Sequence, residues 1–365
     1  MMTCKMRLLV PTWNRIIRQC PISILCRCHK VEPSSRDTIN FTGRESRTYS
    51  EWRTWRLYRM RSRGMIKLEG LDVVPFLQGL VTNDVTQLEE DQGSIYTMML
   101  NPQGRVLYDI IMYRKNQDTD VPCVLMECDQ EVIKDMIKLL KKYKIRKKVD
   151  IAEASNEFQT FAALPSEKQS ERVWLPFKKE EVIHCEPDPR LEVFGWRIVA
   201  RDQQAVIAAT NTDCEVEVRE EREYHIQRYK TGLPEGTLDL PPGQCLPLES
   251  NLVFHNGVSF SKGCYIGQEL TARSHHTGVI RKRLVPIEFD SVPEDVKTGD
   301  TIETADTKKN AGKYRNSLDK FGLGLIRLAE VKKRLVISTP SGQCYNVRAH
   351  IPSWWPQEGE VTVQQ

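Results

Sequence analysis

Hydrophobic and polar positions alternate regularly from Gly64 onward, and the pattern predicts a mixture of strands and short helices. Short apolar runs bounded by turn residues indicate strands over residues 66–68, 95–100, 105–113, 121–127, 149–152, 158–164 and 191–200. Apolar residues at three- and four-residue spacing predict helices over 71–81, from Asp129 to about Tyr143, over 203–210 and from about 218 to 231. The last helix should end at Gly232 and Pro234, which together are a strong stop signal.

The pattern changes after residue 231. Residues 232–263 form a long irregular stretch rich in Gly and Pro, and loops of that length usually carry function or surround a site. Beyond Arg281, short strands are predicted over 284–289, 322–327, 335–338 and 344–350, with turn residues between them. This spacing favours a small β-barrel or sandwich, in which residues 308–319 are expected to be a polar loop.

Charge is distributed unevenly along the chain. Residues 1–63 contain 14 Lys or Arg and 4 Asp or Glu, whereas the rest of the chain contains 39 and 45. Residues 1–31 have no acid at all, and a cationic amphipathic segment of this kind is typical of import into the mitochondrial matrix. The alternative is a basic tail with no targeting role. We expect a mitochondrial presequence and polar linker over 1–63.

The remaining composition excludes several classes of protein. The longest apolar run has about five residues, and a spanning helix needs roughly 20, so no membrane span is expected. The acidic body argues against nucleic-acid binding. The seven cysteines after the leader contain no C-x-x-C pair, which argues against a disulfide scaffold, a structural zinc site and a thiol-redox protein.

The sharpest local signal is Lys262-Gly263-Cys264-Tyr265-Ile266-Gly267-Gln268-Glu269. Lys262 precedes Cys264 by two residues, so in an extended loop its ammonium would favour the thiolate. A helix predicted from Gln268 would place the thiol just before a helix N-terminus, which acts in the same direction, whereas Glu269 opposes it. The alternative interpretation is a buried, inert cysteine.

The glycines of this segment, Gly263 and Gly267, allow sharp turns and the close approach of another molecule. His275 and His276 follow, but adjacent residues of a helix point about 100° apart and would rarely bind one ion. An iron–sulfur cluster normally needs about four ligands, and this chain offers one distinguished thiol. Any cluster at Cys264 would therefore be transient and shared with a partner.

The segment resembles the K-G-C-[FY]-x-G-Q-E signature of the YgfZ-type proteins, relatives of the glycine-cleavage aminomethyltransferase that act in iron–sulfur protein maturation. Flanking residues 247–252 and 275–283 resemble the mitochondrial branch of that family. The resemblance implies an α+β, aminomethyltransferase-like folate-binding domain over 64–280 and a C-terminal β-barrel over 281–365. It implies a late-acting factor for 4Fe–4S proteins in the mitochondrial matrix, with A-type iron–sulfur scaffold proteins as partners, and an assembly role rather than catalysis.

A second resemblance concerns folate. Residues 78–85 and 100–109 are similar to the aminomethyltransferase N-terminal domain, and residues 228–234 to its R-x-E-A-G-L-P segment. The resemblance implies a candidate folate pocket formed by Asn83, Asn101, Asp109 and Arg228. Tyr108 and Lys230 stand where those enzymes are acidic, so tetrahydrofolate binding is expected to be weak or vestigial. The alternative function is a folate-dependent one-carbon or aminomethyl transferase that uses Asp109 as its acid or base.

Overall fold

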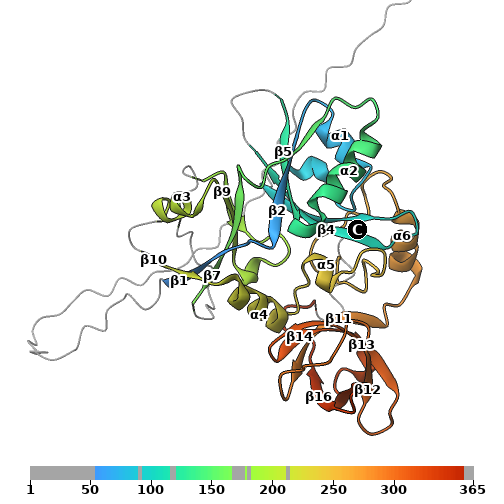
Figure 1. Cartoon of the computed structure of the whole chain (residues 1–365). Coiled ribbons are helices and arrows are strands. Elements are labelled where there is room, and N and C mark those ends of the chain that lie inside the picture. Colours follow the sequence, from blue (N-terminus) through green and yellow to red (C-terminus); the bar gives the residue numbers. More distant parts are fainter. Residues whose placement is uncertain are drawn as a thin grey trace, which may run out of the picture. The chain divides into compact units, whose positions relative to one another are not determined.

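The computed structural model describes residues 54–88, 93–115, 121–166, 177–178, 182–210 and 214–356 of the 365. All the described residues belong to one compact unit within residues 49–365. Its helices and strands are labelled in Figure 1. The expected presequence lies outside the described residues. In the part that is described, no helix is both long and apolar enough to cross a membrane.

The first sheet contains five antiparallel strands in the order β3-β4-β5-β2-β6. They are β2 (Arg63–Glu69), β3 (Ser94–Leu100), β4 (Val106–Arg114), β5 (Cys123–Asp129) and β6 (Asp150–Glu153). Four helical segments accompany them: α1 (Val73–Gln78), η2 (Val85–Leu88), η3 (Gln130–Val132) and α2 (Ile133–Lys144). α1 and α2 share one buried apolar cluster with the sheet and lie together beside β2 and β5 (Figure 1). The strands and both helices occur where the hydrophobic pattern predicts them.

The second sheet has the order β10-β1-β7-β9-β8. Its strands are β1 (Thr54–Arg59), β7 (Gln159–Pro165), β8 (His184–Pro187), β9 (Trp196–Ala200) and β10 (Glu215–Arg219). The accompanying helices are η5 (Glu192–Phe194), α3 (Gln203–Ala208) and α4 (Glu221–Thr231). α4 ends at Gly232, whose φ of +82° is the left-handed conformation that the stop signal predicts.

Three predictions for this sheet differ from the structure. The strand predicted over 191–200 begins only at Trp196, because η5 occupies the residues before it. Residues 32–63 were expected to be a polar linker, but β1 is an interior strand of the sheet, paired with β10 on one side and β7 on the other. Its Trp55 and Leu57 are buried, and the arginines between and after them hid the apolar alternation. The helix predicted from residue 218 begins only at Glu221, because Val218 pairs with Leu57 in β10.

The C-terminal strands form a closed barrel in the order β11-β14-β13-β12-β15-β16, as the strand spacing predicts. They are β11 (Lys282–Phe289), β12 (Thr301–Thr304), β13 (Asn310–Leu318), β14 (Phe321–Arg327), β15 (Leu335–Ser338) and β16 (Cys344–Ala349), with the short helix η6 (Leu328–Glu330). The expected polar loop at 308–319 is wrong, because most of it is β13. Only its inward positions, such as Ala311 and Tyr314, are apolar and buried, so the strand resembles a loop in sequence.

The irregular stretch 232–263 runs between the first sheet and the barrel. It contains one short helix, α5 (Gly236–Asp239). After α5 the backbone pairs with Val106 of β4: Gly243 N donates to Val106 O (2.7 Å), and Val106 N donates to Cys245 O (2.9 Å). Farther along, the Asn251 side chain donates to Leu284 O of β11 (2.7 Å). The stretch leads into the loop before α6 (Gln268–Thr277), where the cysteine motif lies.

Candidate functional site

Cys264 lies at an exposed turn of the loop that precedes α6. Its side chain is exposed, and an added Cβ at the neighbouring Gly263 would meet no atom within 4 Å. Among the described cysteines only Cys264 and Cys344 are exposed; Cys214 is half-buried and the others are buried. The thiol is therefore accessible to another molecule, and the alternative of a buried structural cysteine is wrong for this residue.

Lys262 anchors this loop instead of pointing its charge at the thiol. Its Nζ donates to the backbone oxygens of Val81 (2.8 Å) and Asn83 (2.6 Å) and lies 5.2 Å from the centre of the Tyr265 ring. Burial lowers the pKa of Lys262 to about 8, against the opposing effect of nearby Asp84. The ammonium therefore ties the loop to the segment after α1, a mechanical role that the sequence did not predict.

The other end of the loop is held by close backbone contact. Gly267 has a φ of +80°, and a Cβ there would lie 2.3 Å from Asn101 O and 3.2 Å from the Cα of Gly104. Ile266 N also donates to Gly79 O (3.2 Å). Only glycine permits this approach. The structure thus brings together three of the segments that carry the sequence resemblances, residues 78–85, 100–109 and 262–269.

The start of α6 completes the site. Gln268 is its first residue, and its Oε1 accepts from Tyr265 N (3.2 Å), which closes the turn after Cys264. Glu269 lies in the first helical turn with an exposed side chain. Gln268 and Glu269 therefore form the surface next to the loop that carries the thiol. The exposed Glu269 carboxylate is accessible to another molecule.

The described residues contain no group of three His, Cys, Asp or Glu side chains placed to hold a metal ion. His275 stacks on Phe260, with ring centres 3.7 Å apart and planes 10° from parallel, and His276 is edge-on to the same ring at 6.2 Å. Burial, and then the neighbouring His276, lower the pKa of His275. Cys264 can therefore supply one ligand to a metal or cluster whose other ligands come from elsewhere.

The four candidate folate residues do not form one group. Asn83 donates through its side-chain amide to Tyr96 O (2.8 Å) and Asn256 O (2.8 Å), so it holds two backbone segments together. Asn101 accepts from Arg105 N (2.9 Å) and stabilises the turn between β3 and β4. Both side chains thus make structural contacts, Asn83 between separate segments and Asn101 within its own turn.

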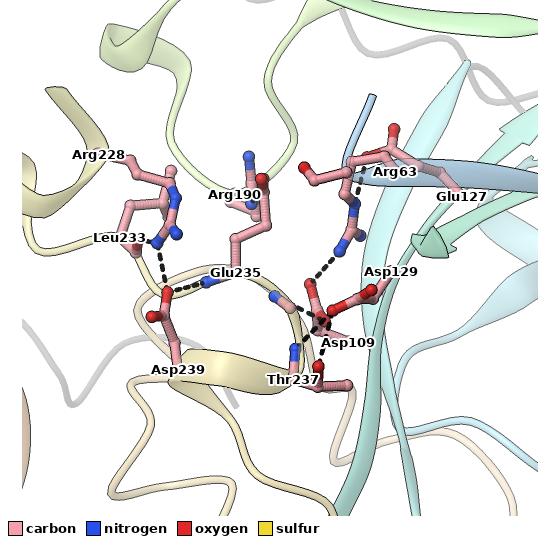
Figure 2. A network of polar contacts seen from close by, with 12 residues as sticks. Arg63, Asp109, Glu127, Asp129, Arg190, Arg228, Leu233, Glu235, Thr237 and Asp239 are labelled. Atoms are coloured by element: carbon pink, nitrogen blue, oxygen red, sulfur yellow. Dashed lines mark hydrogen bonds and ion pairs between the residues drawn. The ribbon is translucent and has the colours of Figure 1, made fainter. Parts of the chain in front are cut away.

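Asp109 and Arg228 contact opposite ends of α5 and belong to one buried network of charges (Figure 2). Asp109 accepts from Gly236 N (3.1 Å) and lies 3.2 Å from Arg63 Nη1, whereas Arg228 pairs with Asp239. Burial, reinforced by Glu235 against the effect of Arg63, raises the pKa of Asp109. Both side chains are almost completely shielded from solvent, with Asp109 only 3% exposed.

The rest of this network was not anticipated from the sequence. Glu127 of β5 accepts from Arg63 Nε (2.8 Å) and Arg197 Nη2 (2.6 Å), so it joins the first sheet to β9 of the second. Glu235 accepts from Arg190 (2.6 Å) and from Arg197 (3.0 Å). The available signal was a lone charge inside an apolar strand, as in Cys123–Asp129 and Trp196–Ala200.

The residues present do not fit a folate ring. Asn83, Asn101 and Arg228 all bond to protein partners. Asp109 Oδ2 faces Arg63 in a buried ion pair, and Glu235 Oε1, which makes no hydrogen bond, is sealed from solvent. A pterin needs accessible hydrogen-bonding groups that converge on one face. These four residues offer it no such face.

Comparison with known protein families matches two parts of the chain. Residues 51–164 match the GCVT N-terminal domain, and residues 281–357 match the CAF17 C-terminal β-barrel domain. Among solved structures, a glycine cleavage system aminomethyltransferase T from Bartonella henselae superposes with a TM-score of 0.61 at 14% identity, covering 84% of this chain and 88% of that one. These matches confirm the expected α+β aminomethyltransferase-like fold with a C-terminal barrel.

Comparison with whole proteins gives longer matches. The chain is 42% identical over 313 residues to the mouse protein named iron–sulfur cluster assembly factor IBA57, mitochondrial, covering 83% of this chain and 86% of that protein. It is 38% identical over 312 residues to the human protein of the same name, with the same coverage. A homologue from Mycosarcoma maydis is 33% identical over 86% of this chain and 88% of its own length.

Proposed function

This chain belongs to the family of the mitochondrial iron–sulfur cluster assembly factor IBA57, and from that premise we propose how it takes part in cluster assembly. It acts in mitochondria as a late-acting factor for the maturation of 4Fe–4S proteins. Cys264 acts at an interface where a cluster, or the partner that carries it, is shared. The cysteine motif had already indicated this family, and the same motif contains the candidate site at Cys264.

The observation that carries the proposal is the exposed thiol on an anchored loop. Lys262 fixes one end of the loop on two backbone oxygens, and Gly267 fixes the other end against the β3–β4 turn. A thiol held in this way keeps a defined position while it remains accessible, which is what a ligand at a shared site requires. Its immediate neighbour Gly263 leaves room for a second molecule.

The number of ligands supports a shared site. A cluster is normally held by about four cysteine thiolates, and Cys264 supplies one. Among the described residues no other candidate ligand completes a group with it. We propose that an A-type iron–sulfur scaffold protein provides the remaining ligands, so that the cluster is bound transiently between two proteins. The cluster is cargo in this scheme and not a resident cofactor of this chain.

The test uses a matched pair of cysteine variants. Cys264→Ser and Cys344→Ser each remove one exposed thiol, but Cys344 lies on β16 of the barrel. Each protein is mixed with an A-type scaffold, ferrous iron and sulfide, and the visible absorption of the complex is followed. Cys264→Ser should lose the coloured complex and fail to restore 4Fe–4S enzyme activity in cells that lack the protein. Cys344→Ser should behave as the unmodified chain does.

Two results would refute the role of Cys264. One is a Cys264→Ser protein that restores 4Fe–4S enzymes fully. The other is a native thiol that reacts with an alkylating reagent only after unfolding, because the loop geometry requires it to be accessible. The folate-dependent transferase is the weaker candidate, since Asp109 is buried, bound to Gly236 N and paired with Arg63.

A further inference from the structure

A second surface stands out by its charge. The C-terminal part of α2 and the segment after it, residues 138–148, contain seven Lys or Arg in eleven residues and no acid. All of these cations except Lys144 are exposed, and Lys144 is the one paired with an acid, Asp150 (3.9 Å). Among the described residues no carboxylate forms an ion pair with the other six. The cluster is all the more distinct because the chain after residue 63 has more acids than bases.

Two aliphatic side chains protrude from the same place. Ile145, which follows α2 directly, is 83% exposed, and Leu71 in the turn before α1 is 64% exposed. The Leu71 turn is held against the basic segment, because Asp72 N donates to Lys148 O (3.3 Å) and Lys148 N donates to Asp72 Oδ2 (2.7 Å). We call residues 138–148 together with Leu71 the basic tip.

Ile145 is exposed at a cost to the backbone. Its φ of +46° and ψ of −102° lie in a region that β-branched residues rarely adopt. Strain of this kind persists where the surrounding structure imposes it, and it is concentrated at functional positions. α2 cannot relieve it by moving, since Ile133, Met136 and Leu140 are buried in the core. The tip is therefore a rigid feature of the fold.

We propose that the basic tip binds the surface of an anionic phospholipid bilayer. Its lysines lie close to the lipid phosphates, while Ile145 and Leu71 enter the boundary between headgroups and acyl chains. Clusters of four to eight Lys or Arg beside exposed apolar residues favour such surfaces through charge attraction and apolar burial together. The contact is peripheral, and it requires no segment that spans the membrane.

The composition of the tip favours a bilayer over other polyanions. Lysine is depleted at protein–protein interfaces, whose energetic centres are Trp, Tyr and Arg, and six of the seven cations here are lysines. Single-stranded nucleic acids are bound through aromatic stacking as well as charge, and the one aromatic residue of the segment, Tyr143, packs against the hydrophobic core. Exposed aliphatic side chains gain apolar burial at a bilayer, whereas a phosphate backbone offers them no apolar surface.

The test measures binding to lipid vesicles by sedimentation, using residues 49–365, which form a compact unit without the basic leader. Vesicles of phosphatidylcholine with phosphatidylserine are compared with vesicles of phosphatidylcholine alone. Each cation near an anionic surface strengthens partition about fivefold, so Lys141→Gln/Lys142→Gln should weaken binding about 25-fold. Ile145→Ser should remove the part of the binding that survives about 0.5 M salt, where charge attraction is screened.

The matched control is Lys308→Gln/Lys309→Gln, which removes the same charge from an exposed turn of the barrel and should leave binding unchanged. Cys264→Ser should also bind vesicles normally, so this test is independent of the proposed cluster site. Circular dichroism and thermal melting check that every variant is folded. The proposal is overturned if the protein ignores anionic vesicles, if it binds neutral vesicles equally well, or if both double variants weaken binding alike. The proposal is also overturned if the protein binds single-stranded RNA or an acidic polypeptide but does not bind the vesicles.

Discussion

Replacing Glu127 by Gln should be among the most destabilising conservative changes in the protein. The Glu127 side chain is fully buried, and its carboxylate accepts hydrogen bonds from Arg63 (2.8 Å), Arg197 (2.6 Å) and the Tyr113 hydroxyl. Glutamine has nearly the same shape, but it carries no charge and turns one acceptor into a donor that faces guanidinium N–H groups. Two buried arginines would each lose a carboxylate partner, so that Arg63 keeps only Asp109 and Arg197 keeps only Glu235.

The expected loss follows from the cost of removing one carboxylate from a buried network of ion pairs. Removing one partner of a buried ion pair typically costs about 3–5 kcal/mol. That is a large part of the roughly 5–15 kcal/mol by which a folded domain is stable. Because Glu127 joins β2 and β5 of the first sheet to β9 of the second, the loss should lower the stability of both sheets together.

Urea unfolding of residues 49–365, followed by circular dichroism and tryptophan fluorescence, measures the change. The matched control is Glu217→Gln, which breaks an equally short pair with Arg219 (2.6 Å) at a solvent-exposed position and should leave the unfolding midpoint nearly unchanged. If Glu127→Gln lowers the free energy of unfolding by less than about 1 kcal/mol, the network does not stabilise the fold as argued.

The same variant has a predicted pH signature. Burial acts to raise the pKa of Glu127, but Arg197 and Arg63 outweigh it and hold that pKa below its ordinary value. A depressed acid pKa contributes stability that is present above the unfolded value of about 4.3 and is lost as the pH falls through the folded value. The unmodified protein should therefore lose stability below about pH 4.3 more steeply than Glu127→Gln.

Three further predictions concern the loop, folate and the leader. Gly267→Ala should cost at least about 1–2 kcal/mol from its positive φ alone, with more from the contact with Asn101 O, whereas Gly263→Ala should be neutral; thermal melting separates the two, and equal effects would contradict the geometry. Calorimetry with tetrahydrofolate at micromolar concentration should give little heat, and tight binding lost in Asp109→Asn would restore the transferase interpretation. N-terminal sequencing of protein from isolated mitochondria should find a mature end between about residue 28 and Thr54, where β1 begins; a full-length cytosolic product would rule the presequence out.

The sequence by itself singled out Cys264 as the candidate residue and predicted most of the local elements. The motif around Cys264 is contiguous, so its spacing is visible without any structure, and it led directly to the family. Strands and helices with one buried and one exposed face also record their periodicity in the chain. The closed barrel could be expected for the same reason, although β13 was mistaken for a loop because its outward positions are polar.

The tertiary structure decided what each of those residues touches. Lys262 lies two residues from Cys264, yet its ammonium binds Val81 and Asn83, about 180 positions away. Gly267 is required because Asn101 O approaches it, and Glu127 is charged because arginines from two sheets meet it in the core. Periodicity reports only whether a position faces the core or the solvent. The packing of the sheets and loops decides which distant group lies opposite each position. The role of a buried charge or of a close backbone contact can therefore be seen only in the tertiary structure.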